Sequence, residues 1–106
     1  FENFLAVELM RTVSAWNEWG IGSFSLYYVR TREGKEVDFL ILKDGSPFML
    51  IEAKNSELKP DSSLLYFYER LKPQFAFQVV LEKEILKQVR PSVFVIDIFH
   101  FLKLLV

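Results

Sequence analysis

The stretch EVDFLILKDGSPFMLIEAKN, residues 36–55, decides how this chain folds. Two runs of strand-forming residues flank the dipeptide Asp44-Gly45, a strong reverse-turn signal, so the stretch predicts a β-hairpin. Each run also carries a carboxylate among its apolar residues, Asp38 in the first and Glu52 in the second. A charged group inside a strand that packs against a core is costly unless something pairs with it. The position of these two carboxylates among apolar residues therefore calls for a structural or functional explanation.

Length and composition describe an ordinary folded domain. The 106 residues suffice for one domain with one modest hydrophobic core. The hydrophobic share of 51% and the charged share of 25% are those of a globular protein. The net charge of −1 provides no global positive field for a polyanion, which counts mildly against nucleic acid. The absence of cysteine excludes disulfides and cysteine-based metal sites.

No apolar run reaches membrane-spanning length, and no signal peptide opens the chain. We therefore expect a cytoplasmic protein with no membrane partner. The chain starts at Phe1, already inside a helical pattern and without an initiator methionine. We expect it to be a fragment of a longer protein that lacks its N-terminal part.

Further helices and strands are predicted on both sides of the hairpin. In chain order they are a helix over 1–16 that ends before Gly20, a strand over 24–30, a helix over 62–72, a strand over 75–81, a strand over 93–96 and a helix over 97–105. Asp61 or Ser62 can cap the helix over 62–72, and Asp97 is expected to cap the closing helix. The segment 82–92 is ambiguous and could form a short helical turn that stops at Pro91. The order α-β-β-β-α-β-β-α predicts a single α/β (α+β) domain over residues 1–106, with a central mixed sheet flanked by helices.

Side-chain alternation suggests that the acidic residues converge. Asp38 and Glu52 lie on neighbouring strands of the predicted hairpin, and Lys54 shares a face with Glu52. Glu8 points into the apolar arc of the first helix, which must pack on a sheet face. One or two carboxylates with water and phosphate oxygens hold Mg²⁺ in many proteins. The pattern therefore indicates a site for Mg²⁺ or Mn²⁺ with a lysine beside it.

A structural alternative stays open for the same residues. Lys54 could form a buried ion pair with Glu52 or Asp38 that serves stability alone. Other polar and aromatic residues favour structural roles: Arg30 can pair with Glu36 across a hairpin, His100 is read as structural, and Trp16 and Trp19 are expected to pack at the helix end.

The acidic pattern also resembles a known superfamily. A carboxylate in the first helix, then Asp38, then Glu52-Ala53-Lys54 on the next strand, in an αβββαβ order, is similar to the PD-(D/E)XK nucleases. The resemblance implies a restriction-endonuclease-like core in which Asp38, Glu52 and Lys54 are catalytic. It also implies that Glu8, Asp38 and Glu52 bind the metal. The sequence departs from the common pattern in having Val37, and not proline, before the aspartate, and it shows no glutamine motif on the second helix.

A closer likeness rests on three motifs: FENF at the helix start, YYVRT before the first turn and GKEVDFL after it. They resemble the domain of unknown function found C-terminal to the ATPase module in many archaeal and bacterial AAA-type ATPases. This resemblance implies that the chain is the C-terminal part of such an ATPase protein.

Two functions follow as expectations. The first is a Mg²⁺- or Mn²⁺-dependent nuclease that hydrolyses DNA phosphodiester bonds while attached to the ATPase module. The second is a catalytically silent interaction or regulatory module of that ATPase. A positive potential near the site would favour the nuclease, whereas an exposed apolar patch on a sheet edge or on the closing helix would favour the docking module.

Overall fold

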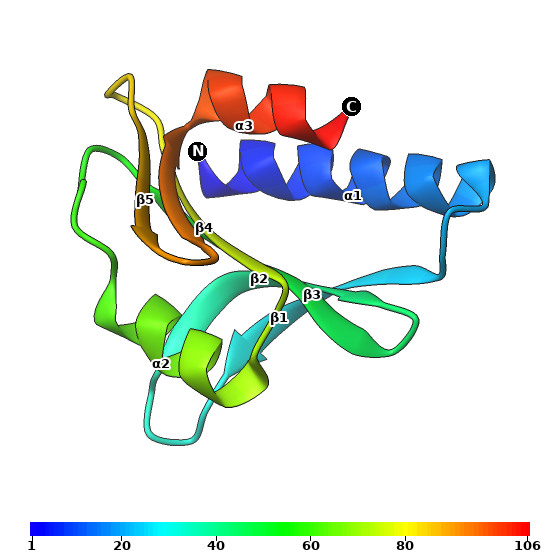
Figure 1. Ribbon diagram of the computed structural model, residues 1–106, viewed down its shortest axis with the longest axis horizontal. Coiled ribbons are helices and arrows are strands. Elements are labelled where there is room, and N and C mark those ends of the chain that lie inside the picture. Colours follow the sequence, from blue (N-terminus) through cyan, green and yellow to red (C-terminus); the bar gives the residue numbers. More distant parts are fainter.

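Six strands form one mixed sheet, and three helices cover its two faces (Figure 1). The computed structural model describes residues 1–106. In chain order the elements are α1 Glu2–Trp19, β1 Phe24–Arg30, β2 Glu36–Lys43, β3 Ser46–Lys54, α2 Ser62–Leu71, β4 Phe75–Val80, β5 Leu86–Arg90, β6 Val93–Asp97 and α3 Ile98–Leu105. The predicted α/β fold with a central mixed sheet flanked by helices is confirmed.

The strands lie in the order β1-β2-β3-β4-β6-β5. The first three form an antiparallel meander, β4 and β6 run parallel to β3, and β5 is an antiparallel edge strand beside β6. Parallel neighbours need a crossover connection, and α2 supplies it between β3 and β4. The C-terminal ends of β3, β4 and β6 therefore lie along one edge of the sheet.

The β2–β3 hairpin forms as predicted around a two-residue turn. Asp44 and Gly45 have φ angles of 51° and 82°, the left-handed conformations that match the twist of the flanking strands. The Asp44 carboxylate also accepts the backbone N–H of Ser23 at 2.9 Å, which ties the turn to the loop after α1. In the hairpin, Leu40 lies opposite Leu50.

One segment was ambiguous in the sequence. Residues 82–92, for which a short helical turn was one possibility, contain the strand β5, which pairs with β6 so that Lys87 lies opposite Val95. Four of its five residues are exposed, and only Val89 packs against the core under α2. An exposed edge strand of this kind has charged and polar side chains at positions that would be apolar in a strand with one buried face. Its sequence therefore lacks the alternation by which strands are recognised.

The sheet separates two hydrophobic layers. The larger layer lies under α1 and α3, and the smaller lies under α2. Four residues of α1, namely Leu5, Leu9, Val13 and Trp16, are buried at three- and four-residue spacings, which is the stripe of an amphipathic helix. The Trp16 indole N–H donates to the Leu105 carbonyl at 3.2 Å and joins α1 to α3. None of the three helices has the length and apolar content needed to cross a membrane.

Both predicted aspartate caps are present. Asp61 caps α2 by accepting the N–H of Ser63 at 2.8 Å, and Asp97 caps α3 by accepting the N–H groups of Phe99 and His100. The His100 ring also bonds to the Asp97 carboxylate, which gives the single histidine of the chain a structural partner.

Candidate functional site

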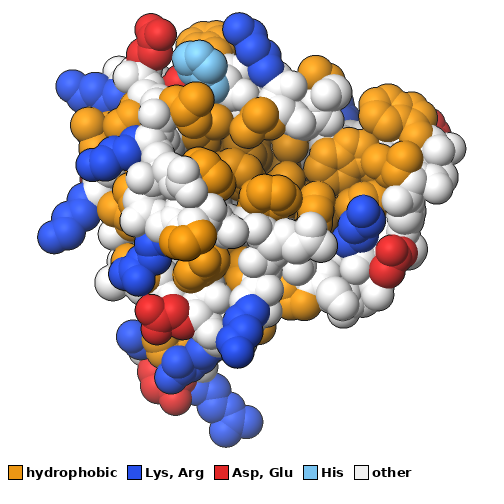
Figure 2. Space-filling view, viewed as in Figure 1, with side chains coloured by type: hydrophobic (Ala, Val, Ile, Leu, Met, Phe, Trp, Pro, Cys, Tyr) orange, Lys and Arg blue, Asp and Glu red, His pale blue; other side chains and the backbone are white.

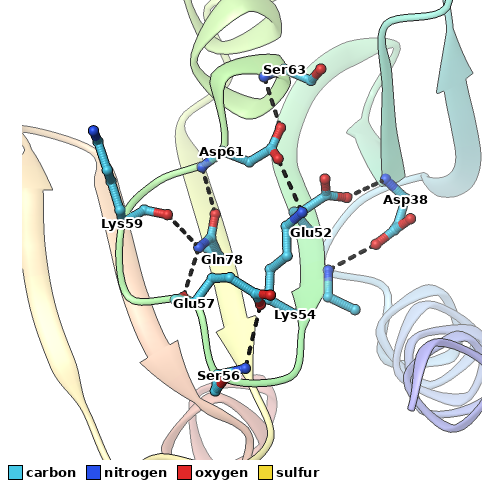
Figure 3. Close-up of polar contacts among 10 residues, drawn as sticks. Asp38, Glu52, Lys54, Ser56, Glu57, Lys59, Asp61, Ser63 and Gln78 are labelled. Atoms are coloured by element: carbon cyan, nitrogen blue, oxygen red, sulfur yellow. Dashed lines mark hydrogen bonds and ion pairs between the residues drawn. The ribbon is translucent and has the colours of Figure 1, made fainter.

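Asp38 and Glu52 lie where the β2–β3 ladder ends. The last paired residues are Phe39 and Ile51, and beyond them the carboxylates replace the backbone acceptors. The N–H of Asp38 donates to Glu52 Oε1 at 3.1 Å, and the N–H of Ala53 donates to Asp38 Oδ2 at 2.8 Å (Figure 3). These bonds satisfy two strand N–H groups and hold one oxygen of each carboxylate in place. The two acidic side chains therefore lie beside each other.

Negative charge accumulates around this pair. Burial, then a hydrogen bond to Asp38 and repulsion from its charge, raises the pKa of Glu52 from 4.5 to about 8. Glu52 is only 7% exposed, so water screens this repulsion poorly. A hydrogen bond to Asp38, followed by repulsion from the same carboxylate, also raises the pKa of Glu2 in the first turn of α1. Asp38 therefore lies between two other carboxyl groups.

Glu8 does not contact the pair. Its carboxylate lies 3.5 Å from Arg11 on the same helix, and its backbone carbonyl accepts the Thr12 hydroxyl at 2.8 Å. Glu8 lies six positions after Glu2, about 9 Å along a helix axis. The helix end, and not its middle, therefore reaches Asp38. No group of three or more histidine, aspartate or glutamate side chains lies in an arrangement that could hold a metal ion.

Lys54 pairs with Asp61, a residue that was predicted only to cap the second helix. Its Nζ lies 3.0 Å from Asp61 Oδ2, whereas the structural alternative paired it with Glu52 or Asp38 (Figure 3). The hydrogen bond to Asp61 raises the pKa of Lys54, and the charge of Glu52 adds to this. Burial opposes ionisation of Asp61, but the bonds from Lys54 and from the Ser63 N–H outweigh it and lower the pKa of Asp61.

Gln78 organises the loop that carries Asp61. It is fully buried on β4 and lies opposite Glu52 in the parallel register. Its amide Nε2 donates to the carbonyls of Glu57 at 2.9 Å and Lys59 at 2.8 Å, while Oε1 accepts the Asp61 N–H at 2.8 Å (Figure 3). A search for glutamine on the second helix alone misses this residue. A lone polar residue inside the apolar run FAFQVVL was the available signal.

The remaining polar and aromatic residues named from the sequence have the expected structural roles, except Trp19. Arg30 pairs with Glu36 at 3.3 Å, as predicted. Trp16 is buried, whereas Trp19 is 62% exposed, so only the first of the two packs into the core. A surface pocket of about 440 Å³ is lined by Asp97 and His100 among others and does not include the acidic pair.

Known proteins resemble this chain in sequence, through a family match, and in fold, through a solved structure. The family described as "Domain of unknown function (DUF4143)" matches residues 1–101. A solved structure, described as a refined half-complex from a tetradecameric assembly of Thermococcus gammatolerans McrB AAA+ hexamers with bound McrC, contains a chain of similar fold. The TM-score is 0.55 at 19% identity, and the match covers 92% of this chain but 26% of that one. No curated protein matches.

Proposed function

This chain belongs to the DUF4143 family of domains of unknown function, and we propose that it is a PD-(D/E)XK nuclease-like domain. In this proposal it hydrolyses DNA phosphodiester bonds with Mg²⁺ or Mn²⁺. The observation that carries the proposal is the adjacency of the Asp38 and Glu52 carboxylates, with Lys54 two residues further along the same strand. Asp38, Glu52 and Lys54 are the proposed catalytic residues.

The donor set fits a hard divalent cation. Asp38 and Glu52 supply carboxylate oxygens, and Mg²⁺ is commonly bound by one or two carboxylates with water and phosphate oxygens completing its shell. A cation would also relieve the repulsion from Asp38, which adds to burial in raising the pKa of Glu52. Glu8, the helix carboxylate proposed from the sequence, pairs with Arg11, whereas Glu2 approaches Asp38 without completing a three-carboxylate metal group. When bound, the metal would activate a water and neutralise charge on the phosphate.

The protein's own groups have separate roles in this proposal. The backbone N–H groups of Asp38 and Ala53 orient the two carboxylates. Lys54, held by Asp61, contributes a positive charge near Glu52 that can stabilise negative charge developing on a phosphate. Gln78 acts indirectly on Lys54, since its three hydrogen bonds hold the loop that ends at Asp61.

The partner in this proposal is an AAA-type ATPase module. The chain would form the C-terminal domain of such a protein and act in the cytoplasm, where DNA and nucleotides are available. The fold shared with a chain of the McrB–McrC assembly supports this partner at the level of architecture.

A second candidate is a catalytically silent docking module of the ATPase. It is favoured by exposed apolar side chains on α1 and α3. Figure 2 shows hydrophobic side chains gathered across the upper half of the viewed face, where these two helices lie in Figure 1. They include Phe4 (50% exposed), Val7 (46%), Met10 (62%), Phe99 (73%) and Leu104 (59%). Large apolar patches of this kind mark interaction surfaces on many proteins.

Metal binding is the first test, because it does not require the ATPase module. Calorimetric titration with Mn²⁺ should show binding to the wild type, and Asp38→Asn should abolish it. The matched control is Glu69→Gln, which removes an exposed carboxylate on α2 and should bind as the wild type does. Absence of Mn²⁺ binding to the wild type would contradict the nuclease proposal.

DNA cleavage is the second test. Supercoiled plasmid with Mg²⁺ or Mn²⁺ should be nicked, and Lys54→Ala should stop nicking without loss of Mn²⁺ binding. Nicking that survives both Asp38→Ala and Lys54→Ala would come from a contaminant. Metal binding without nicking, also in the presence of the ATPase module, would favour the silent docking module.

A further inference from the structure

Two cations without a carboxylate partner meet at one aromatic ring. Lys35 Nζ lies 4.3 Å from the centre of the Tyr66 ring, and the Arg70 guanidinium carbon lies 3.9 Å from it. The ion pairs of the chain involve other cations, so neither charge is neutralised by a neighbouring carboxylate. Each cation is attracted to the ring, and neither is bound to a carboxylate. Both positive charges are therefore available to an anion at this surface.

The fold holds this cation pair in place. Tyr66 and Arg70 lie four residues apart on α2 and therefore share a face of the helix. Lys35 belongs to the turn before β2, and β2 packs against α2 through the buried Leu40 and Phe67. The spacing of the two charges is thus set by a hydrophobic contact and not by the flexible side chains alone.

The surrounding segments are positive in a chain that is negative overall. Segments 30–36, 62–72 and 86–90 contain seven Lys or Arg and three Glu, a net charge of +4, whereas the whole chain carries −1. These segments are neighbours: Lys35 reaches α2 at Tyr66, and Arg90 of β5 lies 3.9 Å from Glu69 of α2. Positive charge is therefore concentrated around α2, and the rest of the chain carries the excess of acid.

We propose that Lys35 and Arg70, held at Tyr66, bind the phosphate backbone of a nucleic acid strand that passes the Asp38–Glu52 pair. This inference rests on the proposed function for the identity of that pair as the reacting site. Arginine matches phosphate oxygens with two parallel N–H bonds, and lysine adds a point charge. Lys35 and Asp38 are three positions apart in the chain, so at most about 10 Å separates their Cα atoms. That distance is about three nucleotides along one strand of B-DNA.

The test is the salt dependence of DNA binding, measured by fluorescence anisotropy with a labelled 20-base-pair duplex. EDTA is present throughout, so neither metal nor cleavage contributes. The variants are Lys35→Gln, Arg70→Gln and the double substitution. The matched control is Lys103→Gln, which removes one positive charge from an exposed position on α3.

Loss of one phosphate contact should lower the slope of log K against log salt by about 0.9. The factor by which DNA affinity falls between 50 and 200 mM salt should then be about 3.5 times smaller for each single variant than for the wild type. The control should keep the wild-type slope. Lys35→Gln and Arg70→Gln variants that keep the control's affinity and slope would overturn the inference.

Two further measurements distinguish DNA from a membrane surface and separate this inference from the proposed nuclease. Vesicles containing about 30% anionic phospholipid test a membrane surface. Binding to vesicles but not to the duplex, lost in the same variants, would overturn the inference in favour of a membrane surface. The two variants should also keep wild-type Mn²⁺ affinity. DNA binding that depends on Lys35 and Arg70, in a protein that binds no Mn²⁺, would support this surface while refuting the proposed nuclease.

Discussion

Glutamine at position 52 should make the domain more stable at alkaline pH in chelator. The wild-type carboxyl has a pKa raised from 4.5 to about 8, because it is buried and lies beside Asp38. Between these two pH values the folded state binds more protons at this group than the unfolded chain does. The stability of the wild type must therefore fall as pH rises through this window, and the cost is fully present above pH 8 and absent below pH 4.5.

The structure sets the size of the effect. One pKa unit corresponds to ~1.4 kcal/mol, so a rise from 4.5 to about 8 means that ionised Glu52 costs the fold on the order of 5 kcal/mol. Glutamine keeps the oxygen that accepts the Asp38 N–H but buries an amide whose second proton lacks a partner, which costs about 1 to 2 kcal/mol. The net gain for Glu52→Gln above pH 8 is therefore about 3 to 4 kcal/mol. A domain of this length gains about 4 to 5 °C per kcal/mol, so the melting temperature should rise by about 15 °C.

Thermal melts from about pH 5 to pH 9 in EDTA measure this directly. At the acidic end the wild-type carboxyl is protonated, so the variant should melt about 5 to 10 °C below the wild type because of its unpaired amide proton. The order of the two melting temperatures should reverse as the pH rises. Glu69→Gln, which removes an exposed carboxylate on α2, is the control and should follow the wild type. Glu52→Gln melting well below the wild type at pH 9 would refute the reasoning, since the carboxylate would then be stabilised by a positive partner such as Lys54.

Three further substitutions test neighbouring parts of the site. Asp38→Asn should hold or raise the melting temperature in chelator, and Mn²⁺ should then stabilise the wild type but not the variant in the same melts; a strongly destabilised variant would indicate a structural ion pair. Asp61→Asn keeps a good helix cap while removing the charge beside Lys54, so denaturant titration should show a loss of at most about 1 kcal/mol, because the pair is partly exposed. A larger loss would mean that the charge itself holds the loop. Gln78→Leu leaves two carbonyls and the Asp61 N–H without their partner, and should cost about 2 to 4 kcal/mol by the same titration; a neutral result would show that water replaces the amide.

Much of the fold was determined by local patterns. The dipeptide Asp44-Gly45 can adopt the two left-handed conformations of a tight turn, so the hairpin could be predicted from a few residues. Asp61 and Asp97 were recognised as caps because a cap bonds to N–H groups two or three residues away. Alternation along the hairpin also placed Asp38 next to Glu52. In each case the interacting groups are close in sequence or joined by a short turn.

The tertiary structure decided what depends on distant neighbours. β5 is a strand because β6 pairs with it, and its own exposed residues carry no apolar alternation. Glu2, and not Glu8, reaches Asp38 because the packing of α1 across the sheet sets which turn of the helix lies near β2. Lys54 pairs with Asp61 because the buried Gln78 on another strand holds the intervening loop. Periodicity reports which face a side chain occupies, but its partner on that face is set by how separate elements pack.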